Sequence, residues 1–130
     1  MASISVLLVD DSPFFLEETR AWLSRHQELV VVGTATTAAE GLALAARLRP
    51  RVVLLDIDMP DMNGIEAARR LKSRPAAPAV VMLTIHCDPA YRAAAAKAGA
   101  DGFVSKADLA TEVLRSLRRA CAQGDPEVGP

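Results

Sequence analysis

The chain has 130 residues, of which 51% are hydrophobic and 24% charged, a composition typical of one globular domain with an ordinary core. Its net charge of −1 does not favour binding to nucleic acid or to anionic membranes. The start, MASISVLLVDD, does not resemble a signal peptide, and no apolar run approaches the roughly 20 residues of a membrane span. We therefore expect a cytoplasmic protein with no membrane contact, in which Cys87 and Cys121 are free thiols.

Five short apolar runs predict the strands of a sheet. They are ISVLLVDD at 4–11, LVVVGTA at 29–35, RVVLLD at 51–56, AVVMLT at 79–84 and the weaker GFVSK at 102–106. Continuous runs of Val, Leu and Ile of this length favour strands that are buried on both faces, as in a parallel sheet.

The first two segments between these runs carry helix start signals. Ser12 is a favoured cap and Pro13 a favoured first residue, and we expect this helix to continue to about His26. Its inward-facing residues are expected to be Phe15, Thr19, Trp22 and Leu23. Thr37 and Glu40 form a capping box in front of GLALAARLR, which predicts the second helix.

Three further helices follow. A short third helix is expected over 65–72, and Asp88 with Pro89 opens an alanine-rich fourth helix that Gly99 ends. Asp108 is expected to cap a fifth helix. The inner side of that helix is expected to carry Leu109, Val113, Leu114, Leu117 and Cys121.

The five strands and five helices alternate along the chain. Right-handed crossovers place such helices on both faces of a parallel sheet, so we predict an α/β fold. The segment AQGDPEVGP at 122–130 has the Gly and Pro content of a linker. We therefore expect one domain over residues 1–121, followed by a tail or the start of a linker over 122–130.

Polar residues close four of the apolar runs. Asp10 and Asp11 end the first, Asp56 the third, Thr84 the fourth and Lys106 the fifth. Ligands of parallel sheets bind at the carboxyl ends of strands, and carboxylates that meet there repel one another unless a cation joins them. A hard divalent cation such as Mg²⁺ is the natural partner, and the lysine and threonine suit the oxygens of a phosphoryl group.

These residues resemble the receiver domain of two-component response regulators, over residues 4 to 121. The motifs that carry the resemblance are DD at 10–11, DIDMPDMNG at 56–64, LT at 83–84, AGADGF at 98–103 and the lysine at 106. The resemblance implies a flavodoxin-like, three-layer (βα)5 fold with strand order 2-1-3-4-5. It also implies a signalling switch controlled by phosphorylation.

The resemblance assigns the chemistry of the acidic residues. Asp56 takes the place of the aspartate that accepts a phosphoryl group from a sensor histidine kinase. Asp10 and Asp11 match the acidic pair that binds Mg²⁺ together with this aspartate, and Mn²⁺ would suit the same ligands. The residue in the place of Asp58 lends its backbone carbonyl to the metal.

The resemblance also implies how the phosphoryl group is sensed and lost. Thr84 and Lys106 match the pair that contacts the phosphoryl oxygens, and Phe103 stands in the place of a switch aromatic. Asp58 and His86 lie two places after the acceptor and after the threonine, beside the path of attacking water, so they are expected to modulate the dephosphorylation rate. The surface of helix four, strand five and helix five is expected to change between the two states.

Ala107 follows the lysine where many receivers have proline. This departure resembles the NarL/LuxR-type subgroup, and the motifs EGLALAARLRP and AGADGFVSKAD point the same way. Members of that subgroup usually carry a C-terminal DNA-binding domain. We therefore expect transcription control through an output domain beyond this chain, DNA contact only through that domain, and a homodimer that forms on phosphorylation.

Three alternatives stay open at the level of sequence. The first is a stand-alone receiver that acts by protein–protein contact, and the second is a pseudo-receiver that never takes phosphate, although the residue set is complete. The third is a haloacid-dehalogenase-type phosphatase, whose aspartyl nucleophile lies in a DxD pair like DID at 56–58. In those enzymes the pair lies on the first strand, so we expect no enzyme activity beyond self-phosphorylation and autodephosphorylation.

Overall fold

The computed structural model describes residues 3–85 and 88–124. They form a five-stranded sheet in the order β2-β1-β3-β4-β5, in which every neighbouring pair is parallel. This confirms the predicted flavodoxin-like fold and its strand order. The strands are β1 (Ile4–Val9), β2 (Leu29–Ala35), β3 (Val52–Asp56), β4 (Ala79–Thr84) and β5 (Gly102–Ser105).

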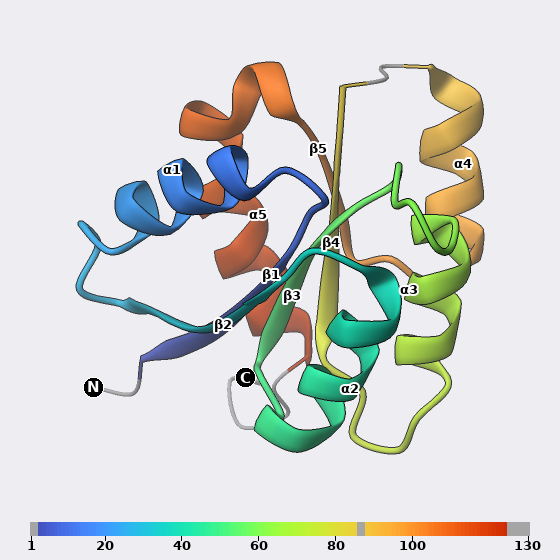
Figure 1. The fold of residues 1–130 in the computed structure, drawn as a ribbon, viewed down its shortest axis with the longest axis horizontal. Coiled ribbons are helices and arrows are strands. Elements are labelled where there is room, and N and C mark those ends of the chain that lie inside the picture. Colours follow the sequence, from blue (N-terminus) through green and yellow to red (C-terminus); the bar gives the residue numbers. More distant parts are fainter. Residues whose placement is uncertain (1–2, 86–87, 125–130) are drawn as a thin grey trace.

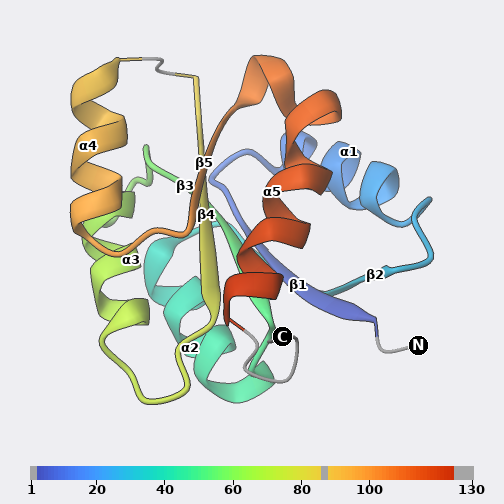
Figure 2. The same ribbon diagram turned by 180° about the vertical axis from the view of Figure 1, so that it is seen from behind.

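Helices cover both faces of the sheet and make three layers (Figures 1 and 2). α1 and α5 lie on one face, and α2, α3 and α4 lie on the other. The bounds are α1 (Pro13–Leu23), α2 (Ala38–Leu48), α3 (Gly64–Lys72), α4 (Pro89–Lys97), the 3-10 turn η1 (Lys106–Asp108) and α5 (Leu109–Gly124). Among the described residues, we find no helix with the length and apolar character that a membrane crossing requires.

Two hydrophobic cores follow from the alternation of side chains along the central strands. On β1, Val6 and Leu8 pack into the core under α1 and α5. Leu7 and Val9 pack into the core under α2, α3 and α4. This double burial explains the continuous apolar runs, because both faces of these strands are covered.

The prediction that every strand is buried on both faces is wrong for β2. Val30 is 45% exposed and Val32 is 37% exposed, whereas all residues of β3 and β4 are buried. β2 pairs only with β1 within the sheet, so it is an edge strand that the helices cover incompletely. Local composition does not distinguish an edge strand from a central one.

The helix starts agree closely with their sequence signals. Ser12 Oγ accepts a hydrogen bond from Phe15 N at 3.2 Å, and Thr37 Oγ1 accepts one from Glu40 N at 3.1 Å. Asp88 caps α4 in the same way. The left-handed φ of 100° at Gly99 follows the end of α4, as expected of a glycine stop.

Other boundaries differ from the prediction. α1 ends at Leu23 instead of continuing to about His26, because the N–H groups of Arg25 and His26 bond three residues back and tighten the last turn. The cap at the start of the fifth helical segment is Ser105, whose hydroxyl accepts from Ala107 N at 3.2 Å. Residue 122, where the predicted tail begins, lies within α5.

Candidate functional site

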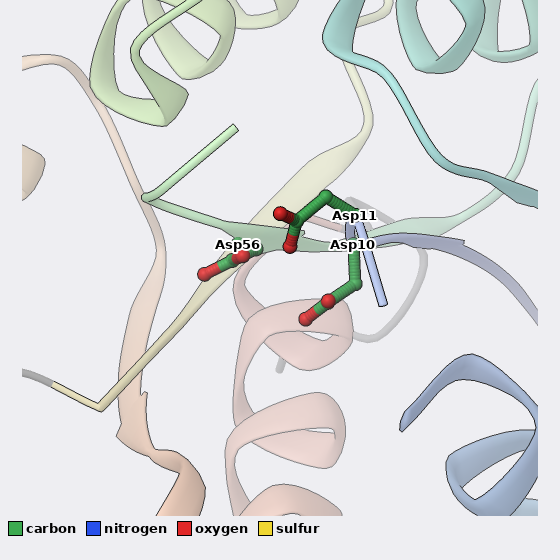
Figure 3. A group of neighbouring side chains, drawn as sticks. All are labelled: Asp10, Asp11 and Asp56. Atoms are coloured by element: carbon green, nitrogen blue, oxygen red, sulfur yellow. The ribbon is translucent and has the colours of Figure 1, made fainter. Parts of the chain in front are cut away.

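Three carboxylates meet at the carboxyl ends of two neighbouring strands. Asp10 and Asp11 follow β1, and Asp56 ends β3, which is the neighbour of β1 in the sheet. One oxygen from each residue lies within 4.8 Å of the others (Figure 3). Asp10 is 1% exposed and Asp56 is 2% exposed, while Asp11 is exposed to solvent.

The ammonium group of Lys106 reaches this cluster from the edge strand β5. It is the first residue after β5, and its Nζ lies 2.6 Å from Asp10 Oδ2 and 3.6 Å from Asp56 Oδ1. The ammonium also lies 4.4 Å from the centroid of the Phe15 ring. Because β4 and β3 separate β5 from β1, the long side chain is needed to span the distance.

The three carboxylates outnumber the lysine, and the pKa of Asp56 reflects its burial and this excess of negative charge. Burial raises the pKa of the Asp56 carboxyl from its ordinary value of 3.8 to about 6, and the nearby Asp10 charge adds to the effect. The Lys106 charge and the backbone N–H of Asp58, 3.3 Å from Asp56 Oδ1, act in the opposite direction. The single lysine therefore compensates the buried carboxylates only in part.

The donor set fits a hard divalent cation. Asp10 Oδ1 accepts a hydrogen bond from Ser12 N at 2.9 Å. Asp10 Oδ2 is buried without a hydrogen bond of ordinary geometry, although the Lys106 ammonium is close enough for an ion pair. Grouped carboxylate oxygens are ligands that Mg²⁺ or Mn²⁺ takes. Asp10, Asp11 and Asp56 could hold such an ion.

The loop between β3 and α3 folds tightly against the end of β3. Gly64 N donates to Ile57 O at 2.8 Å, and Asp58 pairs with Asn63 as an isolated antiparallel bridge. A Cβ at Gly64 would lie 2.2 Å from Asp56 O and 2.6 Å from Ile57 Cα. Only glycine fits at this position, because backbone atoms occupy the space that a side chain would need.

The remaining predicted site residues lie on or near the last two strands. Thr84 ends β4 and is fully buried, and Phe103 on β5 packs against the core under α4. The Arg92 guanidinium of α4 lies 4.8 Å from the centroid of the Phe103 ring. Asp58 has an exposed side chain, and His86 lies outside the described residues.

Sequence reasoning missed the contact of one acidic residue in this loop. The Asp61 carboxylate accepts hydrogen bonds from Ala38 N at 2.8 Å and from Ala39 N at 2.9 Å, at the start of α2. The partners are more than 20 positions away in the chain, so spacing does not reveal the contact. The signal available was the predicted helix start after Thr37, whose first N–H groups need acceptors.

Comparisons with known proteins agree with this architecture. A model of the response regulator receiver domain family matches residues 6–118. The transcriptional regulatory protein MctR of Rhizobium johnstonii is 35% identical over 121 residues, which are 93% of this chain and 56% of that protein. A protein-glutamate methylesterase/protein-glutamine glutaminase of Geobacillus kaustophilus is 41% identical over 107 residues, which are 82% of this chain and 31% of that protein.

Among solved structures, the signal receiver domain of the response regulator NarL from Mycobacterium tuberculosis superposes with a TM-score of 0.88 at 33% identity. The match covers 96% of this chain and 100% of that one. The chain spans about half of the length of the MctR relative and less of the methylesterase. The family match, the parallel sheet and the acidic strand ends together show that the chain belongs to the response regulator receiver domains of two-component systems.

Proposed function

We propose that this receiver domain is a switch that accepts a phosphoryl group on Asp56 from a sensor histidine kinase. The observation that carries the proposal is a buried carboxylate at the end of β3, surrounded by Asp10, Asp11 and the Lys106 ammonium. Asp56 ends the third strand, not the first, which does not match the order in the haloacid-dehalogenase-type phosphatases considered above.

The transfer requires an ionised nucleophile and compensation of charge. One Asp56 oxygen attacks the phosphorus, the bond from phosphorus to the kinase imidazole breaks, and the imidazole leaves and takes up a proton. With a pKa of about 6 for Asp56, the carboxylate is ionised at neutral pH. Lys106, 3.6 Å from Asp56 Oδ1, is placed to pair with a phosphoryl oxygen.

A divalent cation fits this chemistry. Asp10, Asp11 and Asp56 would hold Mg²⁺ or Mn²⁺, with the backbone carbonyl of Asp58 as a further ligand. When bound, the ion would neutralise charge on the carboxylates and on the phosphoryl oxygens. The convergence of one oxygen from each of these three carboxylates to within 4.8 Å of one another supports this assignment.

Phosphorylation would change the conformation of Thr84 first and then of the surface that contains β5. A phosphoryl group adds acceptor oxygens at the strand ends, to which the Thr84 hydroxyl would turn. Phe103 would then move into the space under α4. This helix is held to the core by the buried Ala95 and by Tyr91, which packs against the same core while partly exposed. One small buried side chain and one partly buried ring oppose a shift less than several large buried side chains would, which supports α4 as the element that moves.

The surface of α4, β5 and α5 would carry the change to a partner. A groove of about 640 Å³ lies there, and its lining includes Arg92, Phe103, Glu112, Arg115 and Arg119. A homodimer formed on phosphorylation, or an output domain, would contact this surface differently in the two states. Such a response requires only a few kcal/mol of bias between two packings, in order of magnitude.

The lifetime of the phosphoryl group would depend on the residues beside the water path. Asp58 and His86 are proposed for this role, because an exposed anion and an imidazole can repel, orient or bind the attacking water. Replacing each residue by Ala is expected to change the dephosphorylation rate by more than about threefold, or roughly 0.7 kcal/mol in the barrier.

The output that we propose is transcription control through a DNA-binding domain outside this chain. The similarity to MctR, a transcriptional regulatory protein, supports it, and so does the similarity to the NarL receiver. Residues 1–121 would be the receiver and 122–130 the tail or start of the linker. Receivers also occur in a methylesterase, so the coding sequence after Pro130 is the direct test of the output.

Phosphorylation itself is tested by intact mass after incubation with acetyl phosphate and Mg²⁺. One acyl phosphate should form on the parent chain and none on Asp56→Asn. Asp88→Asn is the matched control, because it changes an exposed aspartate at the start of α4 and should leave the adduct in place. An undiminished adduct on Asp56→Asn, or none on the parent, would overturn the proposal, and the second result would indicate a pseudo-receiver.

The switch is tested separately by amide chemical shifts with and without beryllofluoride, a mimic of the phosphoryl group. Shifts are expected at Phe103 and along α4 in addition to those around Asp56. Changes confined to the loops that follow β3 and β4 would contradict the route through Phe103. The phosphorylation chemistry could still stand in that case.

A further inference from the structure

Asp61 joins the loop of the phosphorylation site to a different helix. The loop runs from Ile57 to Asn63, between β3 and α3, and Asp61 is exposed at its outer part. Its Oδ1 accepts from Ala38 N at 2.8 Å and its Oδ2 accepts from Ala39 N at 2.9 Å. Both oxygens therefore bind the first two N–H groups of α2.

These two bonds satisfy donors at the start of α2. A helix begins with four N–H groups that have no partner inside the helix. The first bond inside α2 runs from Gly41 N to Thr37 O, and the Thr37 hydroxyl accepts from Glu40 N just before it. Asp61 supplies the acceptors for the two groups before Glu40, Ala38 N and Ala39 N. These bonds also lower the pKa of the Asp61 carboxyl, so it is fully charged at neutral pH at the positive end of the helix dipole.

Backbone bonds within the loop hold its base. Met59 N and Gly64 N both donate to Ile57 O, at 3.2 Å and 2.8 Å, and Asp58 forms a bridge with Asn63. The Asp61 bonds tie the outer part of the loop to α2. None of the predicted site residues lies on that helix. The backbone three residues before Asp61 is that of Asp58, whose carbonyl is the proposed metal ligand.

We propose that Asp61 is a positioning residue for the phosphorylation site, which holds the Asp58 backbone in place by clamping the loop onto the start of α2. The inference rests on the proposed function in one respect, the use of the Asp58 carbonyl for Mg²⁺. Asp61 would contact neither the phosphoryl group nor the ion, because both of its carboxylate oxygens are bound to the start of α2. It acts through the backbone of the loop, as outer groups that orient metal ligands do.

The matched control is Glu40→Ala. Glu40 Oε1 accepts from Thr36 N at 3.1 Å, so this variant also weakens the start of α2, but it does not touch the loop. Asp61→Ala removes both bonds to α2. Asp61→Asn keeps one acceptor oxygen and removes the charge, so it should lie between Asp61→Ala and the parent.

Three measurements on the full 130-residue chain distinguish a role of Asp61 in capping α2 from a role in positioning the loop. They are the free energy of unfolding in urea, amide hydrogen exchange of residues 58, 59, 61 and 62 without metal, and Mg²⁺ affinity by calorimetry. Asp61→Ala and Glu40→Ala should both lose stability, and Asp61→Ala should lose more because it removes two bonds where Glu40→Ala removes one. Only the Asp61 variants should show faster exchange of the loop amides together with a raised Mg²⁺ dissociation constant. We expect each to rise by about threefold or more, which is less than the roughly 10–100-fold typical of groups that contact the metal ligands directly, because Asp61 acts through the loop backbone.

If the loop amides exchange at the same rate in Asp61→Ala as in Glu40→Ala, Asp61 does not clamp the loop. Faster exchange with unchanged Mg²⁺ affinity would overturn the positioning role at the metal. If the parent chain binds no Mg²⁺ and takes no phosphoryl group, the proposed function fails, and the exchange measurement alone then decides whether the clamp exists. The two failures are therefore distinguishable.

Discussion

Replacing Asp56 by Asn should stabilise the metal-free protein while it abolishes phosphorylation. The Asp56 carboxyl is 2% exposed, and burial and the charge of Asp10 raise its pKa from 3.8 to about 6. The ionised form is therefore disfavoured in the folded state. Asn has nearly the same shape, and its oxygen can still accept the bond from Asp58 N, so the variant removes the charge with little loss of packing.

The size and pH dependence of the effect follow from linkage. Because the folded-state pKa of Asp56 is above the unfolded value, the parent loses stability as the pH rises from about 4 to about 7. The interval from 3.8 to about 6 corresponds to about 3 kcal/mol in the free energy of unfolding. Asp56→Asn should gain close to this amount at about pH 7.5, roughly half of it at about pH 5, and little at about pH 4.

The assay is urea unfolding in the presence of EDTA, followed by the fluorescence of Trp22, at each of the three pH values. Asp88→Asn is the control for a generic loss of one carboxylate and should follow the parent at all three. A variant that is no more stable than the parent at the highest pH would refute the electrostatic reasoning. So would a gain that stays constant as the pH falls, since that gain could not come from ionisation of Asp56.

Three further results are expected. Gly64→Ala should cost more than about 2 kcal/mol in urea unfolding, because the new Cβ would lie 2.2 Å from Asp56 O; a cost under about 0.5 kcal/mol would show that the loop relaxes freely. Asp11→Ala should weaken Mg²⁺ binding about tenfold or more by calorimetry while the metal-free stability is kept, and unchanged affinity would remove Asp11 from the ligands. Asp101→Asn should cost about 1–2 kcal/mol, since one oxygen is 2.8 Å from Lys72 Nζ and 2.9 Å from Val80 N in a partly buried site; stability equal to the parent would show that water replaces this pair.

Much of the fold could be predicted because its signals are local. The apolar runs of β1, β3 and β4 report burial on both faces, and cap residues such as Ser12 and Thr37 mark helix starts through bonds to N–H groups three residues away. Alternation of strands and helices then restricts the topology, since parallel crossovers are right-handed. The polar residues at the strand ends could be identified in the same way.

The tertiary structure decided what depends on neighbours distant in the chain. The exposure of Val30 on β2 follows from the edge position of that strand, and the pairing of Lys106 with Asp10 follows from the path of a side chain across two intervening strands. The bonds of Asp61 to the start of α2 are of the same kind. Local sequence determines which residues can form a strand, a cap or a charge, because these preferences act within a few residues. Which charges meet, and how completely each is compensated, is set only when the packed sheet brings the strand ends together.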